Sequence, residues 1–173
     1  MTVLKGVWGV LITLLTLVLT YGQFNIESVT LRPTLVVSYL PPTKKFLVDH
    51  GPYSHSYRIE NSGSIVAKNA RVTVITRQQG STPHKDENKQ LGDILPAEKV
   101  VWVNHVHGIV EDGPGRPKYP ITEDVQLIYT GESVLRFWCK PVYFYTATFI
   151  YNEKEKHWVY HVDKPAAEAI RCD

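Results

Sequence analysis

The first hydrophobic feature of the chain is a long stretch without charge. Residues 6–26 carry no formal charge and lie between Lys5 and Glu27. A helix of about 21 residues is about 31 Å long, which matches the ~30 Å hydrocarbon core of a bilayer. The pattern predicts a transmembrane anchor over residues 1–25.

Aromatic residues mark both ends of this stretch. Trp8 lies near one end, and Tyr21 and Phe24 lie near the other, as in the aromatic belts of membrane helices. The alternative is a secretory signal peptide cleaved after residues 20–22. That site lacks alanine, and the uncharged run is longer than the usual apolar region of a signal peptide. The sequence therefore favours a retained anchor.

Small and hydroxyl residues recur within the stretch at spacings of three and four, which places them on one face of a helix. In lipid, such a face permits close approach of a second helix, and threonine hydroxyls can bond across the pair. The alternative is that Gly and Thr are simply tolerated in membrane helices. We expect a helix-docking face formed by Gly6, Gly9, Thr13, Thr16 and Thr20.

The remaining residues, 26–173, show the alternation of apolar and polar positions that is typical of β-strands. The expected strands cover residues 34–40, 57–61, 67–77, 99–110, 121–130, 133–139, 142–151 and 157–162. Polar stretches at 44–56, 78–88 and 111–120 are expected to be loops. Many short strands without a convincing second helix predict a mainly β domain, an antiparallel β-sandwich.

Two details of the strand pattern concern the interior of the sandwich. Trp102, Trp138 and Trp158 fall in expected strands and are predicted to build the core between the sheets. Glu123 and Asp124 are adjacent in a strand, so their side chains should point to opposite faces and cannot act as a pair of carboxylates.

One passage resembles a known family. Asn61-Ser62-Gly63 followed by residues 67–74 (AKNARVTV) resembles the "N-x-G … A-x-N-v-x-V" passage of bacterial immunoglobulin-like domains of the cell-adhesion-related, CARDB-like, type. Residues 145–151 (YTATFIY) also resemble the last hairpin of those domains. The resemblance implies an immunoglobulin-like sandwich with structural or binding roles behind one N-terminal membrane helix. It brings no catalytic residues.

Composition and charge limit the classes of partner and the cellular compartment that we expect. Hydrophobic content of 43% and charged content of 21% are those of a folded domain, and a formal charge of +2 gives no reason to expect nucleic acid. Lys5 precedes the anchor, whereas Glu27 and Arg32 cancel each other after it. The positive-inside tendency then predicts a cytoplasmic N-terminus and a periplasmic or otherwise extracytoplasmic domain.

The two cysteines are compatible with export. A disulfide between Cys139 and Cys172 would join the C-terminal tail to a strand, as is common outside the cytoplasm. The alternative is two unrelated thiols, with Cys139 buried in an apolar strand.

The sharpest candidate for chemistry is His105-x-His107 with Glu111 four residues later. Residues i and i+2 of a strand point to the same side, so both imidazoles and the carboxylate could bind one metal ion. The motif is similar to the first metal motif of cupins, although Lys99 stands where cupins have a glycine. His157 and His161 could add to the cluster if the strands were neighbours. The alternative is a solvated strand face.

Catalytic motifs are missing from the sequence. It contains no G-x-S-x-G and no glycine loop followed by a helix that could hold a phosphate. We therefore expect no enzyme activity and no cofactor. The expected function is that of a non-catalytic accessory subunit that contacts the transmembrane helices and extrinsic surfaces of a larger membrane complex. The alternatives are an exported metal-binding protein and a separate adhesion or ligand-binding module.

Overall fold

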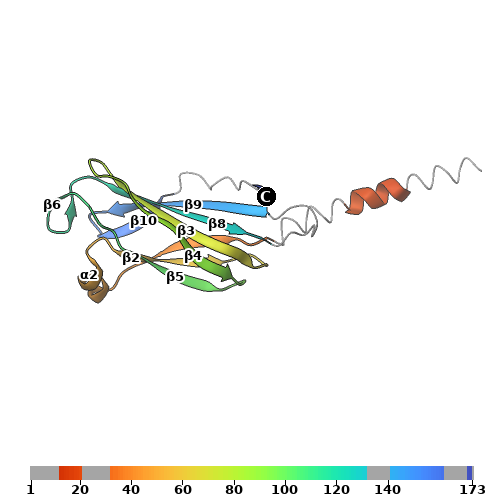
Figure 1. The fold of residues 1–173 in the computed structure, drawn as a ribbon, viewed down its shortest axis with the longest axis horizontal. Coiled ribbons are helices and arrows are strands. Elements are labelled where there is room, and N and C mark those ends of the chain that lie inside the picture. Colours follow the sequence, from red (N-terminus) through yellow and green to blue (C-terminus); the bar gives the residue numbers. More distant parts are fainter. Residues whose placement is uncertain (1–11, 21–31, 132–140, 162–170, 173) are drawn as a thin grey trace, which may run out of the picture.

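A computed structural model describes residues 12–20, 32–131, 141–161 and 171–172 (Figure 1). Their elements, in chain order, are β1 (Leu35–Leu40), α2 (Lys44–His50), β2 (His55–Asn61), β3 (Ala67–Gln78), β4 (His84–Ile94), β5 (Lys99–Asn104), β6 (Glu111–Gly113), β7 (Arg116–Pro117), β8 (Ile121–Thr130), β9 (Pro141–Asn152), β10 (His157–His161) and β11 (Arg171–Cys172).

The strands form two main antiparallel sheets. One has the order β1-β2-β5, and the other has the order β10-β9-β8-β3-β4, with β11 also paired to β9. The short strands β6 and β7 pair with each other. The prediction of a mainly β, antiparallel domain is confirmed, and the arrangement is consistent with the expected β-sandwich.

The described part of the N-terminal segment is helical over residues 12–20. Within the described residues, no helix is both long enough and apolar enough to cross a membrane. The hydroxyls of Thr16 and Thr20 donate hydrogen bonds to the carbonyls of Ile12 and Thr16, at 2.8 and 2.7 Å. Gly6 and Gly9 lie outside the described residues, so the docking face stays a prediction.

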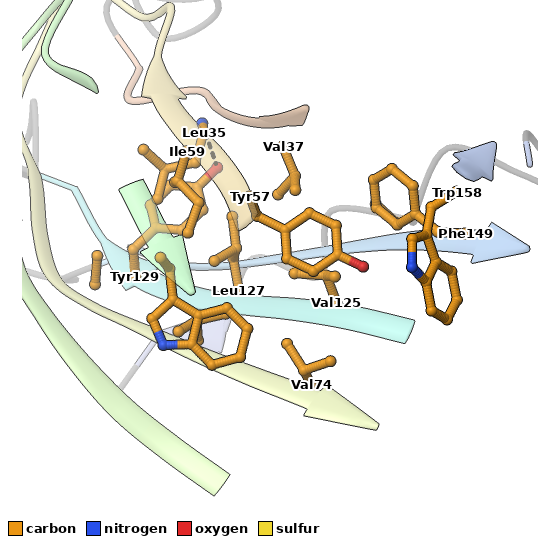
Figure 2. Close-up of a cluster of buried hydrophobic side chains, with 14 of the residues drawn as sticks. Leu35, Val37, Tyr57, Ile59, Val74, Val125, Leu127, Tyr129, Phe149 and Trp158 are labelled. Atoms are coloured by element: carbon orange, nitrogen blue, oxygen red, sulfur yellow. Dashed lines mark hydrogen bonds between the residues drawn. The ribbon is translucent and has the colours of Figure 1, made fainter. Parts of the chain in front are cut away.

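The core lies between the two sheets (Figure 2). Tyr57 and Ile59 of β2 are fully buried against residues of the second sheet, and the rings of Tyr57 and Phe149 lie 4.9 Å apart. Trp102 and Trp158 are buried, as predicted, whereas Trp138 lies outside the described residues. The aromatic rings therefore supply much of the inter-sheet contact, as their large apolar area favours.

Strand β8 shows the period of two most clearly. Val125, Leu127 and Tyr129 are buried on one face, and the residues between them are half-buried. Glu123 shares the buried face and Asp124 points the other way, so the prediction of opposite faces is confirmed. A carboxylate in this row is unusual, because burying a charge is costly unless it has partners.

The motif that carries the family resemblance is a junction at one end of the sheets. The Asn61 side-chain oxygen accepts hydrogen bonds from the backbone N–H groups of Thr34 and Gly63, at 3.2 and 3.0 Å. Its amide donates to the carbonyls of Ile65 and Ile94, at 2.8 and 2.9 Å. Asn61 thus fixes where β1 begins and where β4 ends.

The glycine of the same motif is required by close packing. A Cβ added at Gly63 would lie 2.2 Å from the carbonyl oxygen of Arg32 and 2.5 Å from the nitrogen of Thr34. Both are backbone atoms that cannot move away as a side chain could. The spacing Asn61-x-Gly63 therefore encodes a strand junction.

Residues 44–56 were expected to be a loop, and that prediction is wrong for residues 44–50, which form helix α2, and for His55 and Ser56, which begin β2. Thr43 caps helix α2, because its hydroxyl accepts a hydrogen bond from Phe46 N at 3.2 Å. Gly51, at φ 97°, ends the helix with a conformation that favours glycine. Thr43 and Gly51 are residue types that commonly begin and end helices, but this helix is too short to show a periodic pattern of apolar residues.

Other boundaries also differ from the sequence prediction. Residues 78–88 were expected to be a loop, but β4 begins at His84 and pairs with β3. Its many charged residues fit an edge strand, where charge prevents pairing with other chains. Residues 99–110 were expected to be one strand, but β5 ends at Asn104, and 111–120 contains the β6–β7 hairpin.

Candidate functional site

The connecting segments at one end of the sandwich form the candidate site. Helix α2, the β6–β7 hairpin and the turn between β9 and β10 lie at this end, and β1 begins at the opposite end (Figure 1). The Arg116 guanidinium of β7 contacts the Glu153 carboxylate of the β9–β10 turn at 3.1 Å, which connects the hairpin to this turn. We call this the loop end of the domain.

Four imidazoles follow one another along the loop end. The ring centroids of His50 and His105 are 4.8 Å apart, those of His105 and His107 are 6.4 Å apart, and those of His107 and His84 are 6.2 Å apart. All four residues are exposed. We call this set the histidine row. It unites α2, the start of β4 and the segment after β5.

This geometry agrees with the prediction that the side chains of His105 and His107 point to the same side of the chain. Val106 between them is buried, and the two rings are within 12° of parallel. They lie just beyond the end of β5, where the chain is still extended enough to keep the alternation.

A buried serine holds two parts of the histidine row together. The hydroxyl of Ser54 donates a hydrogen bond to the carbonyl of His50 at 2.6 Å and accepts one from the N–H of Val106 at 3.3 Å. Ser54 is only 1% exposed. The backbone at the end of α2 is therefore tied to the backbone between His105 and His107.

Glu111 lies near the Tyr53 phenol. Burial first, and then a hydrogen bond and the charge of the Glu111 carboxylate, raise the pKa of the Tyr53 phenol far above its ordinary value. Tyr53 is buried, and the alignment of its hydroxyl with the carboxylate falls short of a regular hydrogen bond. Among the described residues, no three His, Cys, Asp or Glu side chains are grouped closely enough to hold a metal ion. The site of His105, His107 and Glu111 thus stays a prediction.

The other predicted residues are placed only in part. His157 lies 3.1 Å from Glu155, and both belong to the β9–β10 hairpin. The backbone of Cys172 pairs with Pro141, close in sequence to Cys139. Cys139 and the side chain of Cys172 lie outside the described positions, so the disulfide stays a prediction.

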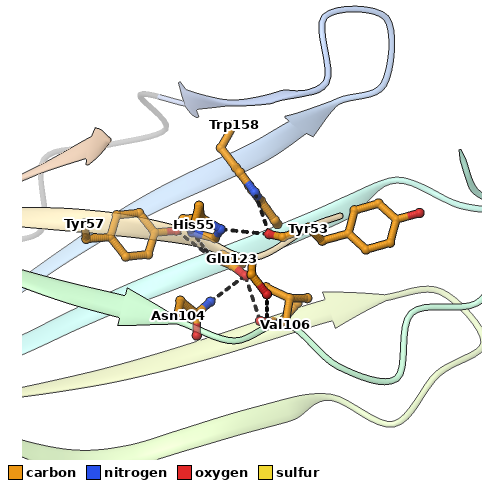
Figure 3. Close-up of polar contacts among 9 residues, drawn as sticks. Tyr53, His55, Tyr57, Asn104, Val106, Glu123 and Trp158 are labelled. Carbon is orange, nitrogen blue, oxygen red and sulfur yellow. Dashed lines mark hydrogen bonds and ion pairs between the residues drawn. The ribbon is translucent and has the colours of Figure 1, made fainter. Parts of the chain in front are cut away.

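Beneath the loop end, a buried carboxylate collects polar partners from both sheets (Figure 3). The Tyr57 hydroxyl donates to Glu123 Oε2 at 2.5 Å, and the Asn104 amide and the Thr76 hydroxyl donate to Oε1 at 2.8 and 3.0 Å. Glu123 is fully buried. These donors satisfy the carboxylate, which explains how it can occupy the interior.

His55 completes this cluster. Its Nδ1 lies 2.9 Å from the Tyr53 carbonyl, which can only accept, so Nδ1 must carry a proton. Its Nε2 lies 3.0 Å from Glu123 Oε2, although without good hydrogen-bond alignment.

The cluster affects the Tyr57 phenol most strongly. Burial, together with the charge of Glu123 and the hydrogen bond to it, raises the pKa of Tyr57 well above its ordinary value. The raised pKa favours the protonated phenol, which donates its hydrogen bond to Glu123. The cluster is closed to solvent and lies in the interior beneath the loop end.

No protein-family model, curated protein or solved structure gives a significant match to this chain.

Sequence reasoning missed three residues of this region. His50 lay in a presumed loop, Ser54 carried no motif, and Glu123 was considered only as half of a carboxylate pair. The signal available for Glu123 was its place in the period of β8, which puts it on the same face as Val125 and Leu127.

Proposed function

We propose that this chain is a non-catalytic accessory subunit of a membrane protein complex. Its N-terminal helix anchors it, and its β domain braces or binds partner subunits at the extracytoplasmic surface. The observation that carries the proposal is the apolar helical segment 12–20 within the uncharged stretch 6–26. Large side chains such as Leu15 and Val18 are 61% and 67% exposed there, so the β domain does not cover them.

The order of the strands supports an immunoglobulin-like domain. In such domains, strands A, B and E share one sheet, and C, F and G share the other, with C′ beside C in variable-type domains. Strands β1, β2 and β5 correspond to A, B and E, and β3, β8 and β9 correspond to C, F and G. Strand β4 takes the place of C′, and β10 extends the sheet beyond β9. Folds of this kind serve binding roles through the loops at their ends.

The buried cluster supports a bracing role over a catalytic one. Glu123 and His55, the residues most similar to an acid–base pair, have no exposed surface. A general base has to come within hydrogen-bond reach of a substrate proton, directly or through one water molecule. We infer that the pair joins the two sheets below the loop end.

The proposal is tested by co-purification from native membranes. The full chain with Gly9→Leu and Thr13→Leu is expected to remain in the membrane fraction and to lose its companion subunits, because larger side chains prevent close helix approach. Val18→Leu, which adds bulk away from the predicted docking face, is the matched control. Unchanged companions in the double variant would contradict helix docking, and extraction of the wild-type chain by alkaline carbonate would contradict the anchor.

A further inference from the structure

The histidine row has the ligand chemistry of a transition-metal site. Imidazole nitrogen binds Zn²⁺, Cu²⁺ and Ni²⁺ well, whereas Mg²⁺ and Ca²⁺ prefer oxygen ligands. His50, His105, His107 and His84 come from three separate segments of the chain, yet each ring lies beside the next. All four are exposed, so a metal ion could reach them from solvent.

The closest pair of imidazoles, His50 and His105, has the centroid spacing expected for two ligands of one metal ion. With a metal–nitrogen distance of about 2.1 Å, each imidazole centroid lies about 3.2 Å from the ion. Two such rings at coordination angles between 90° and tetrahedral have centroids about 4.5 to 5.2 Å apart. The centroids of His50 and His105 are separated by 4.8 Å, which falls inside this range.

This pair is also held in place before any metal binds. Ser54 joins the backbone of His50 to that of Val106, next to His105, through two hydrogen bonds. The ring of Phe46 packs on the ring of His50 at 4.5 Å. Pre-positioned ligands lose less conformational entropy on binding, so affinity is higher than for two unconnected surface histidines.

We propose that His50 and His105 form a two-histidine site for a divalent transition metal of the Zn²⁺, Cu²⁺ and Ni²⁺ class. Since no three ligand side chains among the described residues are grouped around one point, the remaining coordination positions are open to water or to a ligand from a partner. His107 is the imidazole that follows His105 in the histidine row. Glu111, the third ligand of the sequence prediction, lies near the Tyr53 phenol and is not a ligand of the site proposed here.

The first test is calorimetric titration of the detergent-solubilised full chain with Zn²⁺ after treatment with a chelator. We expect one saturable site, at least tenfold weaker in His50→Ala and in His105→Ala. His157→Ala with His161→Ala removes two histidines of β10 and should leave the affinity unchanged. Absence of saturable binding, or equal affinity in the His50→Ala/His105→Ala double variant, would overturn the proposal.

Two further measurements separate this ligand set from others. Glu111→Gln should bind Zn²⁺ as the wild type does, whereas a tenfold loss would favour the ligand set predicted from the sequence. With Cu²⁺ as the probe, electron paramagnetic resonance should show coupling to two imidazole nitrogens, and an oxygen-only spectrum would contradict the site. Circular dichroism of each variant establishes that it is folded. None of these results depends on the membrane anchor, so they are independent of the proposed function.

Discussion

The Nε2 atom of His55 lies 3.0 Å from Oε2 of Glu123 in the interior between the two sheets. His55 belongs to β2 and Glu123 to β8, so the contact joins one sheet to the other. Nδ1 of His55 donates to the Tyr53 carbonyl at 2.9 Å, so contacts on both ring nitrogens orient the imidazole. The interior of the domain is thus fixed by a polar contact as well as by apolar packing.

Removal of the buried carboxylate should destabilise the domain strongly. Glu123→Ala leaves the Tyr57 and Thr76 hydroxyls, the Asn104 amide and His55 without their partner, and we expect a loss of about 3 to 5 kcal/mol in the free energy of unfolding. Glu123→Gln should lose less, because its amide can donate to Nε2 of His55. Urea unfolding followed by tryptophan fluorescence measures both.

The neighbouring carboxylate is a matched control. Asp124 lies on the opposite face of the same strand, where it contacts the Arg77 guanidinium and the Thr148 hydroxyl. Asp124→Ala should cost about 1 kcal/mol or less, because partly exposed ion pairs contribute little. An equal effect of the two alanine substitutions would show that the buried cluster has no special role.

Stability should fall as the pH rises above about 10, where tyrosines of the unfolded chain ionise. The folded protein keeps the proton of Tyr57, since its pKa is raised, whereas the unfolded chain loses it. The folded state then binds more protons, so the free energy of unfolding decreases by about 1.4 kcal/mol per pH unit for this group. Burial and the Tyr160 hydroxyl also raise the pKa of Tyr145, to about 12.

This pH dependence is measured by urea unfolding at about pH 9 and about pH 11, with absorbance at 295 nm to follow phenolate formation. Tyr57→Phe should be less stable at neutral pH because it loses its hydrogen bond to Glu123. It should also lose less stability between the two pH values. The same loss in wild type and variant would contradict the assignment to Tyr57.

The Asn61 junction should be sensitive to substitution. Asn61→Ala removes four hydrogen bonds to the backbone, and we expect a loss of about 3 kcal/mol, because buried and partly buried backbone groups are left unpaired. Asn152, whose side chain accepts from Lys154 N in an exposed turn, is the control. Asn152→Ala should cost less than about 1 kcal/mol, and thermal unfolding of both variants tests the difference.

Ser54 connects the interior to the histidine row, so Ser54→Ala should weaken Zn²⁺ binding. The variant keeps both imidazoles but removes the hydrogen bonds that tie His50 to Val106. We expect an affinity about threefold to tenfold lower, since the ligands are no longer pre-positioned. Ser56→Ala, on the next outward position of β2, is the control for calorimetry. Wild-type affinity in Ser54→Ala would exclude a positioning role.

The period of the strands could be predicted from the sequence, but contacts between distant segments could not. Alternation in β8 placed Val125, Leu127 and Tyr129 inside and separated Glu123 from Asp124, because neighbouring residues of a strand face opposite sides. The partners that make Glu123 tolerable inside come from β2, β3 and β5. No local pattern indicates such an arrangement.

The histidine row illustrates the same limit. The i, i+2 rule placed His105 and His107 together, and Glu111 was added as the carboxylate of a motif similar to that of cupins. The structure instead places His50, the last residue of the short helix α2, against His105. That contact depends on where the chain turns at Gly51 and on the Ser54 hydroxyl, and neither belongs to a repeating pattern.

The most direct test of the proposed function is site-specific photocrosslinking in native membranes. A photoreactive side chain at Thr13, on the predicted docking face, should give a discrete adduct with one partner subunit, and the same group at Leu15, on the opposite side of the helix, should give little. Equal crosslinking from both positions, or no protein adduct from Thr13, would contradict the claim that this helix lies against another.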